Sequence, residues 1–135
     1  MDAVRSLSAG LIRIQYEDLP ETAINASKRV LLDLLGAAFA GVDAAGIPGL
    51  RRVICQAYAS AGTSVWACRS KVPAPESALV NSAMAHALDF DDTHDRACLH
   101  AGVSVIPAAL SLSEQVGGVS GRDFLTAITV GIDCI

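Results

Sequence analysis

Apolar residues recur at spacings of three and four along most of this chain, as Val4, Leu7 and Leu11 do near its start. This period places them on one face of an α-helix. Capping signals separate the segments, for example Asp18 before a proline and Ser120 three residues before an acid. The pattern predicts an all-α fold, a bundle of about six helices. We expect these helices at residues 3–16, 18–40, 46–62, 75–88, 103–116 and 120–135.

Other local signals refine this prediction. The run from Thr63 to Cys68 is the only β-like stretch, because it is rich in β-branched and aromatic residues. Gly41 is expected to end the second helix in a left-handed conformation. The fourth helix is made almost wholly of small and apolar residues, so it should be buried on most sides. The last helix reaches Ile135 with no cap, which predicts that residues 1–135 are the N-terminal domain of a longer chain.

The composition narrows the class of protein. A chain of 135 residues fits one domain, and 52% hydrophobic against 18% charged residues predicts apolar surface that another chain or segment covers. A net charge of −4 without a basic stripe argues against nucleic acid. Asp33, Asp43 and three glycines interrupt the longest apolar stretch, which argues against a membrane span, and no signal peptide is evident. The four scattered cysteines include no CxxC pair, so we expect reduced, buried thiols in a cytoplasmic protein.

The titratable side chains are concentrated between His86 and His100, in the segment HALDFDDTHDRACLH. This segment holds all 3 histidines and several of the 14 acidic residues of the chain. Its acidic residues are Asp89, Asp91, Asp92 and Asp95. Whatever chemistry the protein performs, the sequence places it here.

Two metal sites can be considered. Asp91, Asp92 and Asp95 match the DDxxD spacing by which helical prenyl-diphosphate enzymes hold magnesium. That site also needs a second acidic motif and cationic groups, which this chain lacks, and a five-residue pattern is weak evidence. The other is a histidine–carboxylate site, whose ligands would be His86, Asp89, His94 and His100. It lacks an HExxH-type pairing, so we expect no metal.

The third interpretation is metal-free acid–base chemistry. Carboxylates crowded around histidines titrate as a coupled set, and such a group donates or removes a proton near neutral pH. If the fourth helix continues for one more turn, His86, Asp89 and Thr93 lie on one face, Asp91 points away and Asp92 lies between. The competing structural interpretation is a helix end followed by a solvated acidic loop.

The segment from Ala78 to His94 closely resembles the hallmark segment of the MmgE/PrpD family. Tyr16–Pro20 and Leu31–Gly36 are similar to the family's opening, and Pro107–Leu110 and Ser120–Asp123 to its next helices. The resemblance covers nearly the whole chain. It implies the helical first domain of a two-domain enzyme that typically forms a dimer. Members include 2-methylcitrate dehydratase, cis-aconitate decarboxylase and iminodisuccinate epimerase, which act on small di- and tricarboxylates without metal or organic cofactor.

The resemblance also implies roles for particular residues. Asp89 and Thr93 match active-site positions of the hallmark, and His100 matches the histidine that follows it. Here His100 is followed by Ala101 where the family usually has proline, so its loop is expected to be looser. The family's later catalytic lysine, histidine and tyrosine would lie beyond Ile135. A polycarboxylate needs cations, and the candidates Arg69, Lys71, Arg96 and Arg122 are more simply surface charges.

The sequence thus predicts a 2-methylcitrate-type dehydratase, a cofactor-independent lyase and a cytoplasmic homodimer. In this hypothesis His100 is the catalytic acid–base group and Asp89 orients it or the substrate hydroxyl. Thr93 is the substrate-binding residue and hydrogen-bonds a substrate carboxylate. The alternatives are a decarboxylase or epimerase of the same family, or a non-catalytic fragment that needs the missing region or a partner chain. We expect no nucleic-acid or membrane partner.

Overall fold

The computed structural model describes residues 2–58 and 62–135, in which helices are the dominant secondary structure. The α-helices are α1 (Ala3–Leu11), α2 (Glu21–Ala40), α3 (Ile47–Ala57), α4 (Ala74–His86), α5 (Ala101–Val116) and α6 (Gly121–Asp133). Two short 3-10 helices, η1 (Tyr16–Asp18) and η2 (Gly41–Asp43), flank α2. The strands β1 (Thr63–Ser64) and β2 (Lys71–Val72) form one antiparallel hairpin. The predicted all-α fold with about six helices is confirmed.

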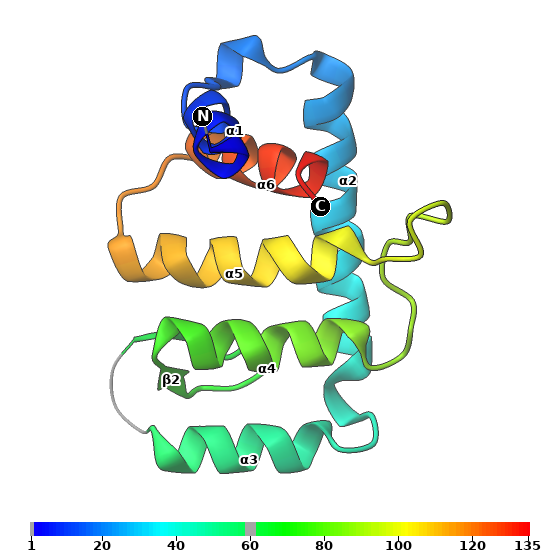
Figure 1. Cartoon of the computed structure of the whole chain (residues 1–135). Coiled ribbons are helices and arrows are strands. Elements are labelled where there is room, and N and C mark those ends of the chain that lie inside the picture. Colours follow the sequence, from blue (N-terminus) through cyan, green and yellow to red (C-terminus); the bar gives the residue numbers. More distant parts are fainter. Residues whose placement is uncertain (1, 59–61) are drawn as a thin grey trace.

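Helix α4 lies at the centre of the bundle. Figure 1 shows α3, α4 and α5 stacked beside one another, with the long helix α2 running across one end of the stack. α4 packs against α2, α3 and α5, and α5 also packs against α6. Val80, Met84 and Ala85 of α4 are completely buried. The prediction that small and apolar residues would bury this helix on most sides is confirmed.

The hydrophobic core joins α4 to every neighbouring helix. From α2 come Ile24, Leu34 and Ala38, which are all buried. The residues at the centre of the core are Leu34, Ala38, Ile47, Val65, Val72, Val80, Met84, Ala85, Ile106 and Ile128. Burial of apolar area on this scale is the main term that stabilises the bundle.

Several element ends differ from the sequence prediction. α1 ends at Leu11, about a turn early, and the chain then forms η1. Asp18 does not cap α2, because its carboxylate accepts a hydrogen bond from the backbone N–H of Gln15 at 2.9 Å. α3 ends at Ala57, and residues 59–61 of the predicted third helix lie outside the described residues. At α6 the predicted cap is confirmed, since Ser120 Oγ accepts from the N–H of Asp123 at 3.1 Å.

Gly41 follows α2 for a different reason from the one predicted. Its φ is −80°, which is right-handed, so the expected left-handed stop is wrong. A Cβ at this position would instead overlap the backbone carbonyl oxygen of Met84. Glycine is needed here because α4 approaches the chain too closely for any side chain.

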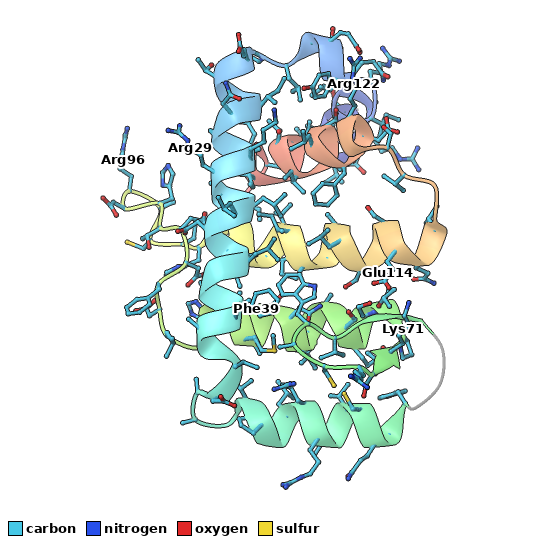
Figure 2. All side chains as sticks on the ribbon, turned by 180° about the vertical axis from the view of Figure 1, so that it is seen from behind. Arg29, Phe39, Lys71, Arg96, Glu114 and Arg122 are labelled. Atoms are coloured by element: carbon cyan, nitrogen blue, oxygen red, sulfur yellow. The ribbon has the colours of Figure 1, made fainter. Side chains whose placement is uncertain are left out.

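Polar side chains of α4 and α5 hold the hairpin. Only Thr63 and Ser64 of the predicted β-like run form a strand. Asn81 Oδ1 accepts from the N–H of Trp66 at 2.9 Å. Glu114 accepts from the N–H of Ser64 at 2.7 Å and pairs with Lys71 at 2.9 Å, as Figure 2 shows for the two labelled side chains. The hairpin is therefore fixed by charge-assisted bonds rather than by strand length.

Apolar side chains remain on the surface, as the composition predicted. Leu32, Phe90 and Val116 are 74%, 73% and 69% exposed. Within residues 2–58 and 62–135, no single helix combines the length and the apolar character needed to cross a membrane. One helix pair, Glu21–Asp43 with Ile47–Ala57, passes that test by length and composition together, with a bend of 93°.

The loop of residues 87–100 carries most of the titratable segment. It connects the C-terminus of α4 to the N-terminus of α5, and Figure 1 shows it projecting beyond α2. The N–H of His94 donates to the carbonyl oxygen of Leu99 at 2.8 Å, which closes the outer part of the loop on itself. Because α4 and α5 pack side by side, the two ends of the loop are held close together.

Candidate active site

Two histidines meet where α4 ends and α5 begins. His86 is the last residue of α4, and His100 is the N-cap residue of α5. Their ring centroids are 4.7 Å apart, with the rings in an edge-to-face arrangement. Packing of the two helices, and not the sequence spacing of 14 residues, brings the imidazoles together.

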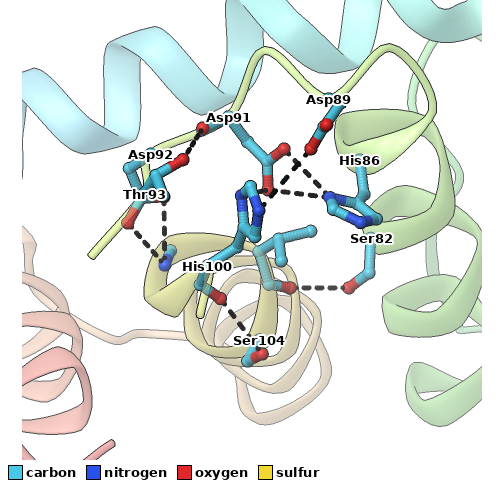
Figure 3. A network of polar contacts seen from close by, with 10 residues as sticks. Ser82, His86, Asp89, Asp91, Asp92, Thr93, His100 and Ser104 are labelled. Atoms are coloured by element: carbon cyan, nitrogen blue, oxygen red, sulfur yellow. Dashed lines mark hydrogen bonds and ion pairs between the residues drawn. The ribbon is translucent and has the colours of Figure 1, made fainter. Parts of the chain in front are cut away.

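Asp91 lies between the two histidines (Figure 3). Its side chain is completely buried, and Oδ1 is 3.0 Å from Nδ1 of His86. Oδ2 is 3.3 Å from Nδ1 of His100, but this contact is out of line for a hydrogen bond. Within the described part of the chain, His100 Nδ1 is buried without a hydrogen-bond partner. A carboxylate only accepts hydrogen bonds, so the bond to His86 requires a proton on Nδ1 of that ring. A charge buried this completely is tolerated when polar partners face it.

Asp89 approaches the other nitrogen of His100. Its Oδ1 lies 3.5 Å from Nε2, so the His100 ring stands between two carboxylates. The Asp89 side chain is 79% exposed and that of His100 is 24% exposed, so Nε2 is on the open side of the cluster. The predicted pairing of Asp89 with His100 therefore has a geometric basis. Asp89 has φ 57°, a left-handed conformation that aspartate adopts more readily than most residues.

The helical-face argument from the sequence is wrong. α4 ends at His86, and the chain turns sharply at Asp89 instead of continuing the helix. Asp91, which was expected to point away, is the buried centre of the cluster. The reason is tertiary: the N-terminus of α5 places His100 where a carboxylate from the loop can fill the space between two imidazoles. The spacing of residues within the segment does not predict where α5 lies.

Thr93 is the predicted site residue that the structure leaves outside the cluster. Its Oγ1 donates to the backbone carbonyl oxygen of Asp91 at 3.5 Å, near the limit for a hydrogen bond. In Figure 3 it lies on the opposite side of Asp91 from His86. Its hydroxyl is therefore only weakly held and remains exposed.

The DDxxD arrangement does not form. Asp91 faces the histidines, whereas Asp92 accepts from the backbone N–H of Gly102 with both carboxylate oxygens at 3.1 Å. Asp92 thus binds one of the free N–H groups in the first turn of α5. Asp95 is exposed on the outer part of the loop. Carboxylates that point in these directions do not converge on one ion.

The four side chains His86, Asp89, Asp91 and His100 nevertheless form a group of metal-ligand types. Their ligand atoms all lie within 4.8 Å of one another. Three of them belong to the histidine–carboxylate set considered from the sequence, with Asp91 in place of His94. Around a tetrahedral zinc ion, ligand atoms at about 2.0–2.2 Å from the metal lie closer together than that, so the group would have to contract. His94 is not part of the group, and its Nδ1 accepts from the N–H of Ala97 at 3.1 Å.

The ion pairs of the described lysines and arginines lie away from this cluster. Lys71 pairs with Glu114, and Arg122 pairs with Glu17 at 3.0 Å. Among the described residues, no lysine or arginine forms an ion pair with Asp89 or Asp91. The cluster therefore offers proton donors and acceptors but no positive counter-charge for a polycarboxylate.

The fold and the cluster together define a helical domain with two imidazoles and two carboxylates gathered at the junction of two helices. The chain belongs to the MmgE/PrpD family, since residues 5–134 match the family's N-terminal domain. The resemblance noted in the sequence is confirmed.

Similar proteins include cis-aconitate decarboxylases. The mouse protein of that name is 31% identical over 138 residues, and the human protein is 31% identical over 133 residues. A cis-aconitate decarboxylase-like protein of Aspergillus oryzae is 27% identical over 126 residues. These matches cover 98%, 95% and 89% of this chain, but only 28%, 27% and 26% of the relatives. The chain thus spans little more than a quarter of their length.

Proposed function

We propose that this chain supplies the acid–base half of the active site of a lyase that acts on small tricarboxylates, with decarboxylation of cis-aconitate as its reaction. The observation that carries the proposal is the His100 ring, whose Nε2 faces the open side beside Asp89 while Nδ1 faces buried Asp91. The sequence favoured dehydration of 2-methylcitrate and kept decarboxylation as an alternative. The names of the similar proteins favour that alternative.

Both reactions need one group that moves a proton next to a carboxylate-bearing carbon. In decarboxylation the C–C bond to the departing carboxylate breaks, CO₂ leaves, and the electron pair passes into an allylic carbanion. A proton from Nε2 of His100 then forms the new C–H bond. In dehydration a base removes the proton alpha to a carboxylate, and an acid protonates the departing hydroxyl group.

The neighbours of His100 have separate roles in this mechanism. Asp91 faces Nδ1 from behind and favours a proton there, which leaves Nε2 for the substrate. Asp89 accepts from Nε2–H when the ring is protonated, and so aligns the proton before transfer. Thr93 carries an exposed hydroxyl that donates to a substrate carboxylate.

The charge of the cluster limits what the chain does alone. A tricarboxylate beside Asp89 and Asp91 is repelled unless cations offset its charge. Because none of the described lysines and arginines forms an ion pair with the cluster, we propose that the cations come from another part of the protein or from a partner chain. A homodimer in the cytoplasm belongs to the same proposal, and light scattering would give twice the 13.9 kDa of one chain.

Two assays test the proposal. One measures CO₂ release from cis-aconitate, and the other measures formation of the unsaturated product from 2-methylcitrate. Each rate is compared with the background rate measured without protein. His100→Ala should lower turnover by at least about tenfold, since general acid–base help contributes about 10²–10⁴-fold. His94→Ala is the matched control, because it removes an exposed imidazole from the same loop. Equal turnover of the two variants would remove His100 from the mechanism.

Two further results would change the proposal. If neither substrate is turned over and neither raises the melting temperature, the chain is a non-catalytic fragment, because a ligand that binds the native state must stabilise it. If exhaustive chelation abolishes turnover and added zinc restores it, the metal-free mechanism is wrong. The four-residue cluster would then be a metal site.

A further inference from the structure

A second group of reactive side chains lies where α3 meets the turn between β1 and β2. Arg51 of α3 donates from Nη2 to the backbone carbonyl oxygen of Ala67 at 2.7 Å, which ties the helix to the turn. Cys55 comes four residues after Arg51, one helical turn further along the same face. Cys68 directly follows Ala67 in the turn. Both cysteines therefore belong to the same junction of α3 and the turn, and the side chain of Cys55 is among the groups that lower the pKa of Cys68.

Cys68 has the environment of a reactive thiol. It is exposed, which corrects the expectation that the cysteines are buried, and its Sγ lies 3.4 Å from Oγ of Ser70. The pKa of Cys68 is lowered from 9.0 to about 7. The side chain and the backbone N–H of Ser70 are the main causes of the lowered pKa. Burial opposes them, and the side chains of Cys55 and Arg51 lower the pKa by smaller amounts.

Arg51 provides an independent sign that an anion belongs here. Its Nε is buried and has no hydrogen-bond partner within the described part of the chain. A buried donor without an acceptor costs free energy, and a charged donor costs more. The Arg51 side chain is also among the groups that lower the pKa of Cys68, so its positive charge favours the thiolate.

We propose that Cys68 is a peroxide-sensitive thiol and that Cys55 resolves its oxidised form as an intramolecular disulfide. Cys55 is half-buried and packs against the core, so it is shielded from direct attack while it lies beside Cys68. This division into an exposed low-pKa thiol and an adjacent resolving thiol is the arrangement of redox-sensor cysteines. It rests on α3 and the hairpin turn, and is independent of the function proposed for the histidine cluster.

The chemistry balances with hydrogen peroxide as the oxidant. The Cys68 thiolate attacks one peroxide oxygen, the O–O bond breaks, and the sulfur becomes a sulfenic acid while hydroxide leaves and takes up a proton as water. The Cys55 sulfur then attacks the Cys68 sulfur, the S–O bond breaks, and the departing hydroxide takes the Cys55 proton. Two thiols and one peroxide thus give one disulfide and two waters.

The expected selectivity follows from the thiolate fraction. At pH 7 about half of a thiol with pKa about 7 is ionised, against about 1% at the ordinary value of 9.0. A thiolate of lower pKa is also a weaker nucleophile, with a Brønsted coefficient of about 0.4–0.5. Over this pKa difference the weaker nucleophilicity divides the gain in thiolate fraction by roughly eight. Cys68 should therefore react with a limiting aromatic disulfide reagent about sixfold faster than an ordinary exposed thiol.

The test treats the whole chain with hydrogen peroxide and maps the products by mass spectrometry. We expect a Cys55–Cys68 disulfide in the wild-type chain and a sulfenic acid on Cys68, trapped by dimedone, in Cys55→Ser. Cys98 and Cys134 are exposed controls within the same molecule. Arg51→Gln should slow the reaction of Cys68 and leave these two controls unchanged.

Two outcomes would overturn the proposal. The first is reaction of Cys68 with the disulfide reagent no faster than that of Cys98 and Cys134. The second is dimedone labelling of Cys68 in the wild-type chain equal to that in Cys55→Ser, with no joined peptide. If Cys55→Ser does not fold, the wild-type disulfide map and the Cys98→Ser/Cys134→Ser variant decide the question, because both cysteines of the pair are intact there.

Discussion

Replacement of Asp91 by alanine tests whether the buried carboxylate organises the histidine cluster. The change removes the acceptor of His86 Nδ1 at 3.0 Å and the charge that faces His100 Nδ1 at 3.3 Å. Because Asp91 is the only completely buried carboxylate among the paired acids of the described residues, its loss should be felt in stability as well as in turnover.

The magnitude follows from the two contacts. A hydrogen bond to a charged group contributes about 1.5–3 kcal/mol, and the low end applies to His86 because its side chain is 51% exposed and water replaces the lost acceptor. His100 Nδ1 is buried and loses the charge beside it, which adds about 1 kcal/mol. The sum is about 2.5 kcal/mol. For a domain of this size, that lowers the melting temperature by about 10 °C.

The assay is urea unfolding followed by circular dichroism and by the fluorescence of Trp66, the single tryptophan. Coincident curves establish two-state unfolding, and the midpoint shift at constant slope gives the loss in free energy. Asp95→Ala is the matched control, since its exposed carboxylate should cost less than about 0.5 kcal/mol. A loss for Asp91→Ala within 0.5 kcal/mol of this control would refute the reasoning.

Three other predictions concern stability. Gly41→Ala should destabilise the chain by about 2 kcal/mol or more in urea unfolding, because its Cβ meets a rigid backbone carbonyl of α4, whereas exposed Gly36→Ala has open space and should not. Asp92→Ala should cost about 1 kcal/mol by loss of the α5 cap, and an unchanged midpoint would contradict the cap. Burial raises the pKa of Glu114, but its bonds to Ser64 and Lys71 outweigh burial and lower the pKa below 4.5. The carboxylate therefore contributes its full stability above pH 4.5, and this stability is lost as pH falls through the lowered pKa. The stability gap between wild type and Glu114→Gln should therefore be about 1 kcal/mol at pH 7 and shrink in acid, and a gap that stays constant with pH would contradict the pairing.

Prediction from the sequence succeeded where local patterns control structure. Apolar spacing, composition and capping signals together located the α-helices of the described residues, and Ser120 marked the start of α6 correctly. Prediction from the sequence failed at the ends of elements that are determined by contacts with other parts of the structure. Asp18 bonds to Gln15 instead of capping α2, and Gly41 is required by the approach of α4, which its own neighbours in sequence do not reveal.

The same division applies to the site. The sequence by itself determined that the titratable side chains gather between His86 and His100, and the family resemblance predicted Asp89 and His100 as the candidate groups. Only the tertiary structure decided that Asp91 is the buried centre, and that Asp92 caps α5 rather than binding magnesium. The physical reason is that the loop's conformation is fixed by where α5 packs against α4. Packing between two helices produces no periodic pattern in the sequence of the loop that joins them.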